Sequence, residues 1–480
     1  MSTQVFVPIE TKKKKHVVMF PWLAFGHIIP FFELSKSIAQ KGHKISFIST
    51  PRNIDRLPKL PPHLASSITL VKIPLPNTQG LPENAEATMD VKTQDIEHLK
   101  TAYDGMEVAL TLFLEKKSSN ADIIIYDFSA HWVPPIAARL GISRYFFCIF
   151  NAWFLAFMGT TEALINGLED RVRPEDFLVP PKWVTFQSKA AYRLYEANWI
   201  LGAAGNNASG FSDTYRAGKA IAGSNAMIIR HCNEFQPEWL KLLEELHRIR
   251  VIPLGLMPPS LQNYTANSTK DTFVSVRDWL HHQKKGSVLY IALGSEVVLS
   301  RDQLGELAHG LELSGLPFLW ALRKPAGTDD DAVELPDGFE ERIEGRGVVW
   351  RNWAPQLEIL SHESVGAFLT HCGWSSVVEG LAFGRPLIML PFLVDQGMNA
   401  RVLADKKVGV EVPRDEHDGA YTRNGVAQTV RMVMVEEDGV GGEEIRETAK
   451  LASAVFGDKQ LHDRYVDDFI EYLEKQEEKA

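Results

Sequence analysis

Short apolar runs alternate with helix-length segments along almost the whole chain. In the first half, six runs lie at His16–Phe20, Lys44–Ser49, Ile68–Ile73, Asp122–Tyr126, Arg144–Ile149 and Ala226–Arg230. In the second half, six more lie at Val288–Leu293, Phe318–Leu322, Val348–Trp350, Val365–Leu369, Leu387–Leu390 and Val408–Val412. Because these runs lack a strict alternation of apolar and polar residues, they predict parallel strands buried on both faces. Helix-length segments between them, such as Phe31–Lys41 and Thr93–Lys117, complete an α/β pattern.

A polar segment divides this pattern into two halves. Residues 258–271 are rich in Pro, Ser, Thr and Asn, a composition typical of a linker. A chain of 480 residues is also too long for one ordinary core. We therefore expect two Rossmann-like domains with a cleft between them. The expected parts are an N-terminal domain over 1–250, a linker over 251–275, a C-terminal domain over 276–455 and a final helix over 456–480.

The composition argues against several kinds of partner. A formal net charge of −10 disfavours nucleic acid and anionic membranes. The most apolar stretch, Tyr145–Met158, is interrupted by Asn151 and too short to span a bilayer, and the N-terminus lacks the apolar core of a signal peptide. Three cysteines without CxxC spacing predict neither a disulfide framework nor a zinc site. We expect a cytoplasmic monomer without a transmembrane segment.

One window has the residue types of a nucleotide-sugar site. It opens with Trp353-Ala354-Pro355-Gln356, an aromatic face followed by polar groups, which suits a base and a ribose. The run His371-Cys372-Gly373-Trp374-Ser375-Ser376 then links a strand to a helix, a turn that aims backbone N–H groups at phosphate oxygens. Glu379 follows in that helix, and Asp395 and Gln396, after the next strand, fit sugar hydroxyls. Taken singly, the Trp could be a core residue and the Glu a surface residue.

Over its 44 residues, from Trp353 to Gln396, this window resembles the signature box of the plant UDP-dependent glycosyltransferases of family 1. The resemblance implies the two-domain fold called GT-B, with Asp463–Lys475 crossing back to the first domain. It also implies a UDP-sugar as co-substrate, no cofactor and no metal ion. The acidic Asp329–Asp331 does not link a predicted strand to a helix, so we expect it in a surface loop. The implied donor-binding residues are Gly294, Ser295, Trp353, Ala354, Gln356, His371, Gly373, Trp374, Ser375, Ser376, Glu379, Asp395 and Gln396. The family usually has Asn at the position of Ser375, which leaves the contact made there open.

His27 and Asp127 are the candidate catalytic pair. Each follows a predicted strand of the first half, so both are expected at the carboxyl edge of one sheet, where α/β proteins bind ligands. Alone, they could be a packed histidine and a turn aspartate. The resemblance implies a general base for His27 and its partner for Asp127. Neutral imidazole can take the proton of an attacking hydroxyl, and the carboxylate then stabilises the imidazolium. Direct attack on an α-linked UDP-sugar inverts the anomeric centre without a covalent intermediate.

The donor and acceptor are less closely defined. Gln396 resembles members that use UDP-glucose, although users of UDP-rhamnose can also keep Gln. The segments Trp22–His27, Ser49–Asn53 and Ala292–Glu296 resemble a subgroup that extends sugars already attached to flavonoids or terpenoids. We expect sugar-on-sugar transfer from UDP-glucose, with transfer of rhamnose or transfer to a bare aglycone as alternatives. Candidate acceptor-binding residues, which could equally be core, are Trp22, Phe25, Trp132, Phe150 and Asn151.

Three other classes fit the sequence less well. A UDP-sugar epimerase would not match the box over its whole length. A non-catalytic nucleotide-sugar-binding protein would result if His27 and Asp127 did not meet in the fold. A nicotinamide-dependent enzyme would need a G-x-G-x-x-G turn after the first strand, where Phe20-Pro21-Trp22-Leu23 stands instead.

Overall fold

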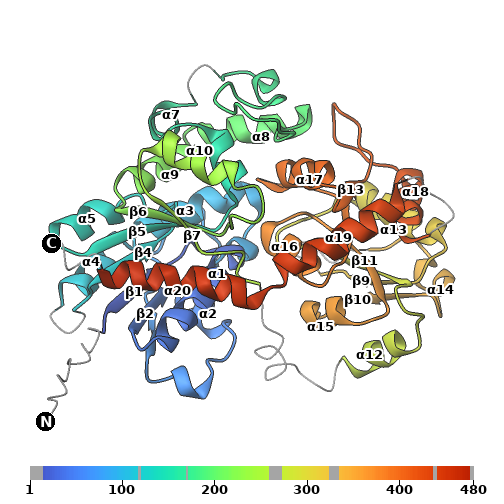
Figure 1. The fold of residues 1–480 in the computed structure, drawn as a ribbon, viewed down its shortest axis with the longest axis horizontal. Helices are drawn as coiled ribbons and strands as arrows, with labels where there is room; N and C mark the ends of the chain where they lie inside the picture. Colours follow the sequence, from blue (N-terminus) through green and yellow to red (C-terminus); the bar gives the residue numbers. More distant parts are fainter. Residues whose placement is uncertain are drawn as a thin grey trace, which may run out of the picture.

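The computed structural model describes residues 14–116, 120–168, 171–258, 273–323, 334–435 and 441–475. Asp329–Asp331 and most of the predicted linker lie outside these ranges. The described chain forms two parallel sheets with helices packed around them (Figure 1). This confirms the predicted α/β fold of two Rossmann-like domains.

The N-terminal sheet has the strand order β3-β2-β1-β4-β5-β6-β7, and every neighbouring pair is parallel. Its strands are β1 His16–Phe20, β2 Lys44–Ser49, β3 Ile68–Lys72, β4 Ile123–Tyr126, β5 Ser143–Cys148, β6 Ala226–Ile229 and β7 Val251–Pro253. Its helices are α1 Phe25–Gln40, α2 Pro51–Asp55, α3 Ile96–Asp104, α4 Glu107–Glu115, α5 Val133–Arg139, α6 Ala152–Met158, α7 Thr161–Asn166, α8 Leu194–Ala204, α9 Asp213–Ala222 and α10 Glu238–His247.

The C-terminal sheet repeats the arrangement with the order β10-β9-β8-β11-β12-β13, again all parallel. Its strands are β8 Val288–Ala292, β9 Phe318–Ala321, β10 Gly347–Trp350, β11 Val365–Thr370, β12 Leu387–Met389 and β13 Gly409–Glu411. The helices that follow in sequence are α12 Val274–His281, α13 Arg301–Ser314, α14 Phe339–Arg342, α15 Gln356–Ser361, α16 Trp374–Ala382, α17 Gln396–Asp405, α18 Arg423–Met434, α19 Gly442–Phe456 and α20 Lys459–Lys475.

All twelve predicted apolar runs are strands, with ends that differ by at most a few residues. Strand β4 shows why the pattern worked, because its four residues are buried without interruption, as a strand covered on both faces requires. One further strand, β7, was not predicted by any apolar run, and it lies within the range 251–275 expected for the linker. It has only three residues, ends in Pro253 and pairs with β6 at the edge of the sheet.

Each sheet has a switch point, where the strand order reverses direction. In the first sheet it lies between β1 and β4, and in the second between β8 and β11. Loops that leave the carboxyl ends of two such strands turn to opposite faces and open a crevice. His27 and Asp127 follow the strands of the first switch point, and Gly294 and His371 follow those of the second.

The helix near the end of the chain returns to the first domain. In Figure 1, α20 (red) runs across that domain beside α1. Its apolar side chains Val466, Phe469, Ile470 and Leu473 belong to the same buried cluster as residues of β1, β2 and α1. The ring of Phe469 packs edge-on against Tyr145 of β5, with centroids 6.0 Å apart. Among the described helices, none is long and apolar enough to cross a bilayer.

The two domains share a packed interface. Trp153 of α6 meets Trp374 of α16 edge-on, with ring centroids 5.0 Å apart, and both belong to one buried cluster that spans the two domains. At the segment that leads into α8, Arg193 pairs with Glu411 and Glu416, and Arg401 pairs with Glu196. These contacts hold the carboxyl edges of the two sheets toward each other.

Candidate active site

His27 and Asp127 meet in the first domain. Nδ1 of His27 lies 2.8 Å from Oδ2 of Asp127, and both side chains are almost completely buried. The carboxylate is itself held by the backbone, because Oδ2 accepts the N–H of Trp22 at 3.0 Å and Oδ1 accepts the N–H of Phe128 at 2.7 Å. The rings of Phe128 and Phe150 flank the imidazole, with centroids 5.7 and 5.5 Å away. The imidazole therefore has a fixed orientation, with Nδ1 on the carboxylate and Nε2 on the opposite side of the ring.

The second domain contributes a helix N-terminus at the switch point of its sheet. The first N–H groups of a helix have no intrahelical acceptor. Gly373 precedes α16 and offers them no side-chain cap. The ring of His371 lies against two glycines, since a Cβ at Gly294 or Gly373 would come 2.7 or 2.6 Å from its Nε2. Gly294 also has φ +79°, a conformation that favours glycine. Backbone groups can thus approach a ligand closely here.

His371 is uncharged at physiological pH. Burial lowers the pKa of His371 to about 4, so the imidazole carries one N–H and remains neutral. The unsatisfied amides of α16 suit an anionic group such as a diphosphate.

The ring of Trp353 is 51% exposed, and a second polar group is formed by Gln356 and Glu379. Nε2 of Gln356 donates to Oε2 of Glu379 at 2.6 Å, and the Tyr290 hydroxyl donates to Oε1 of the same Gln at 3.2 Å. Burial raises the pKa of Glu379, against the opposing effects of Gln356 and of the positive charge of Arg230. An exposed aromatic face next to a carboxylate can bind a base and a ribose.

Asp395 and Gln396 lie at the start of α17, across the cleft from the catalytic pair. Burial raises the pKa of Asp395 to about 6, and the amide of Asn399 and the charge of His27 act in the opposite direction. Oε1 of Gln396 accepts the N–H groups of Phe392 and Leu393 at 2.9 and 2.8 Å, which leaves its amide N–H groups for other acceptors. A carboxylate and an amide are thus placed near the imidazole of the other domain.

Comparison with known proteins decides the family. The model of the family described as UDP-glucoronosyl and UDP-glucosyl transferase matches residues 259–440. UDP-glycosyltransferase 91D1 of Stevia rebaudiana is 49% identical over 469 residues, which cover 97% of this chain and 94% of that protein. The soyasaponin III rhamnosyltransferase of Glycine max is 42% identical over 468 residues, 96% of each protein. The chain belongs to the plant UDP-dependent glycosyltransferases.

A solved structure agrees with this assignment. UGT2 of Phytolacca americana, complexed with UDP-2fluoro-glucose and pterostilbene, is 25% identical and superposes with a TM-score of 0.73, covering 96% of this chain and all of that one. The present chain is therefore an enzyme of the GT-B fold that transfers sugar from a UDP-sugar.

Three donor residues predicted for this glycosyltransferase have surroundings that the sequence did not indicate. The indole N–H of Trp374 donates to the carbonyl of Arg230 at 3.0 Å, and its ring is buried in the domain interface. Ser295 does not cap the next helix, because Ser300 caps α13. The hydroxyl of Ser375 accepts a hydrogen bond from Arg230 at 2.6 Å.

Most predicted acceptor residues belong to the core. Trp22 packs edge-on against Tyr103. Trp132 is buried, and its N–H donates to Asp104 at 3.2 Å. Asn151 is fully buried and caps α6. Phe150 and Phe25 are only partly buried, and Phe150 contacts His27, so these two remain candidates for acceptor contact.

Asn399 is a site residue that the sequence did not suggest. Its Oδ1 accepts the Asn151 amide at 2.6 Å and the Trp153 indole N–H at 2.9 Å. Its Nδ2 donates to Asp395 at 2.7 Å and to the carbonyl of Cys372 at 3.0 Å. Asn399 is completely buried, so this network joins the first domain to the carboxylate of Asp395.

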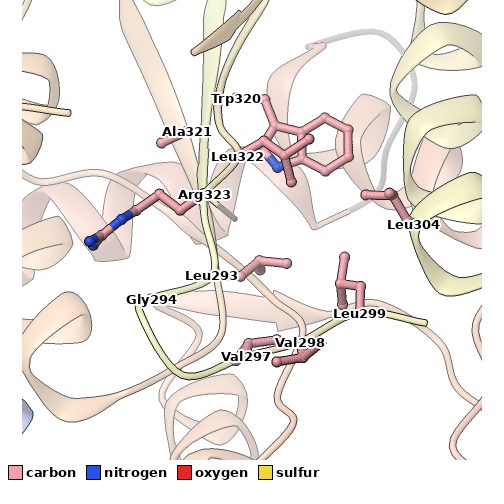
Figure 2. Close-up of a pocket in the computed structure, with 10 residues that line it drawn as sticks. All are labelled: Leu293, Gly294, Val297, Val298, Leu299, Leu304, Trp320, Ala321, Leu322 and Arg323. Atoms are coloured by element: carbon pink, nitrogen blue, oxygen red, sulfur yellow. The ribbon is translucent and has the colours of Figure 1, made fainter. Parts of the chain in front are cut away.

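A pocket beside Gly294 is separate from this site. Figure 2 shows it between the loop after β8 and the end of β9. Its lining residues are Leu293, Gly294, Val297, Val298, Leu299, Leu304, Trp320, Ala321, Leu322 and Arg323. Among the predicted donor residues, only Gly294 lines this pocket. Over the described ranges, no group of three or more His, Cys, Asp or Glu side chains could hold a metal ion.

Proposed function

We propose that the enzyme transfers glucose from UDP-glucose, with inversion and without a metal ion, to a hydroxyl of a sugar already attached to a terpenoid or flavonoid. The observation that carries the mechanism is the 2.8 Å contact between His27 Nδ1 and Asp127 Oδ2 at the switch point of the first sheet. The class of enzyme rests on the family, whereas the residue roles, the donor and the acceptor below are our proposals.

In the proposed reaction, Asp127 keeps a proton on Nδ1 of His27, so that Nε2 is unprotonated and can act as base. The acceptor hydroxyl loses its proton to Nε2 while its oxygen bonds to the anomeric carbon of the donor. The bond from that carbon to the UDP oxygen breaks on the opposite face, and its electron pair leaves with UDP. The imidazolium that forms is stabilised by the Asp127 carboxylate.

The departing UDP gains negative charge, which the second domain is suited to stabilise. The first N–H groups of α16, the hydroxyl of Ser376 and the neutral His371 are donors at the end of that helix where the dipole favours an anion. Gly294 lets its backbone approach the same group. We propose that these groups bind the diphosphate and replace a metal ion.

The remaining contacts position the donor. We propose that the exposed ring of Trp353 stacks on uracil and that Gln356 and Glu379 bind the ribose. The ionised Asp395 and the free amide of Gln396 accept from and donate to hydroxyls of the sugar. The charge of His27 lowers the pKa of Asp395, so the two side chains are close enough to interact. We therefore propose that the anomeric carbon lies between them, at the boundary of the two domains.

The donor has one specific alternative. The relative from Glycine max is a rhamnosyltransferase, which keeps UDP-rhamnose as a second candidate for this chain. A bare aglycone is likewise a second candidate for the acceptor. The Asp127–His27 contact favours catalysis over the binding of nucleotide sugars alone, because a pure binding protein has no need of an oriented base.

A competition assay by mass spectrometry tests the proposal. The purified enzyme receives UDP-glucose and UDP-rhamnose together, with flavonoid and terpenoid acceptors offered both as aglycones and as monoglucosides. We expect a gain of one hexose on the monoglucosides only. A gain of deoxyhexose would change the donor, and modification of the aglycones would overturn sugar-on-sugar transfer. The His27→Ala variant, matched in concentration, should form product far more slowly than the wild type.

A further inference from the structure

Arg230 follows β6 of the first domain and crosses to the second. Its Nε donates to the carbonyl of Leu256 at 2.7 Å, and its NH2 group lies 3.4 Å from the carbonyl of Met257. Its NH1 group donates to the hydroxyl of Ser375 at 2.6 Å, in the first turn of α16. The guanidinium thus reaches the helix end whose amides have no cap.

This guanidinium is buried without a counter-ion. Arg230 is only 4% exposed, and no carboxylate of the described chain lies within ion-pair distance of it. Burial lowers the pKa of Arg230 to about 10, although the charges of Glu379 and Glu33 oppose the change, so the group stays protonated at physiological pH. A buried charge that lacks a partner is costly, and the usual compensation is an ion of opposite sign.

The contacts of Arg230 also leave donors unused. A guanidinium has five N–H groups in a fixed fork, and Arg230 uses three of them on Leu256, Met257 and Ser375. Ser375 is partly buried, and its hydroxyl holds the end of the guanidinium beside the first turn of α16. Fork-shaped donors of this kind match the oxygens of a phosphate.

We propose that Arg230 is a ligand of the UDP diphosphate, delivered from the acceptor domain to the N-terminus of α16. It supplies a full positive charge where the second domain supplies only partial charges, and it binds the leaving group directly. The proposal rests on use of a UDP-sugar, and it does not depend on which sugar or acceptor is used. Because the residue belongs to one domain and the helix to the other, UDP would also join the two domains.

The competing explanation is that Arg230 has only a structural role. Arg230 could serve only to hold the chain at Leu256 and Met257 and to support Trp374 through its backbone carbonyl. Loss of a purely structural residue should lower the affinity for every donor-site ligand equally. Loss of a phosphate ligand should lower the affinity only for nucleotides that carry phosphate. Comparing UDP with uridine therefore separates the two explanations.

The test measures dissociation constants for UDP and for uridine by ligand-observed NMR titration of the full chain. For Arg230→Met we expect UDP to bind about 10- to 100-fold more weakly, the loss typical of a hydrogen bond to a charged group, with uridine changed less than about twofold. Arg385→Met is the matched control, since Arg385 is another largely buried arginine that donates to two backbone carbonyls, those of Leu360 and His362. Its UDP affinity should equal that of the wild type.

Unchanged UDP affinity in Arg230→Met, or equal losses for UDP and uridine, would overturn the proposal. If this variant does not fold, Arg230→Lys offers the same contrast, because it keeps the charge but loses the fork; UDP should weaken several-fold and uridine should not. Neither titration needs an acceptor, so an incorrect acceptor assignment would leave the result intact and would appear only in the competition assay.

Discussion

Replacing Asp127 by Asn removes the charge beside His27 and leaves one backbone N–H without an acceptor, whichever way the new amide is oriented. With its oxygen in place of Oδ2, the amide keeps the contacts with Trp22 and His27, but its NH2 group faces the N–H of Phe128. With the opposite orientation, the NH2 group faces Trp22 and His27. The imidazole must then accept at Nδ1 and carry its proton on Nε2, where it cannot act as base.

The size of the effect follows from these contacts. In both orientations the imidazolium loses a charge-assisted hydrogen bond of about 1.5–3 kcal/mol. If that stabilisation is present only in the transition state, kcat falls by about 10- to 150-fold. His27→Ala should lose more, because removal of a general base typically costs about 10²- to 10⁴-fold. UDP affinity should be unchanged in both variants, since neither His27 nor Asp127 is among the residues proposed to bind UDP.

The assay is steady-state turnover at saturating donor and acceptor, with UDP affinity measured in parallel. Asp104→Asn is a suitable control, because Asp104 also accepts hydrogen bonds within the first domain, from Arg216 and Trp132, but lies outside the catalytic pair. It should lower thermal stability without a comparable loss of kcat. The role given to Asp127 is excluded if Asp127→Asn keeps kcat within about twofold of the wild type, or if its UDP affinity falls in step with kcat.

Three further predictions concern the donor side. Burial raises the pKa of Asp395 to about 6, so its ionised form is lost as the pH falls through that value. The affinity for UDP-sugar should therefore fall about fivefold at low pH, whereas the affinity for UDP alone should not. Equal pH profiles for the two ligands would exclude a contact between Asp395 and the sugar. Asn399→Ala should lower the melting temperature. By removing a donor to Asp395 it should also raise the pH at which UDP-sugar affinity is lost; an unchanged pH would show that Asn399 does not control the ionisation of Asp395. Gly294→Ala should lower the affinity for UDP by at least about tenfold, because the new Cβ would meet His371. Gly315→Ala is the control and should keep the affinity of the wild type, since Gly315 also has a positive φ, +72°, but open space around it. Equal UDP affinities in the two variants would refute a close approach of the Gly294 backbone to UDP.

The parts of the fold that sequence predicted are those that local pattern determines. Buried parallel strands require uninterrupted apolar residues, so runs such as Ile123–Tyr126 were visible without a structure. His27 and Asp127 could be placed because both follow such strands and because parallel strands bring their carboxyl ends to one edge. The short edge strand β7 has too few residues for a pattern.

The features that sequence did not predict depend on contacts between distant segments. Asn399 meets Asn151 across 248 residues, and Arg230 meets Ser375 across 145. No local pattern distinguishes such an Asn or Arg from an ordinary helix or strand-end residue. Trp374 is a further example, because its position in the box did not indicate that its ring packs edge-on against Trp153 of the first domain.

The configuration of the product is the decisive observation for the proposed mechanism. A single displacement with His27 as base requires that the product of an α-linked UDP-sugar carry the new bond in the opposite configuration. The coupling constant of the anomeric proton, read by NMR on the purified product, distinguishes the two forms. For UDP-α-glucose we predict a β-linked product; an α-linked product would contradict direct attack by a hydroxyl that His27 deprotonates.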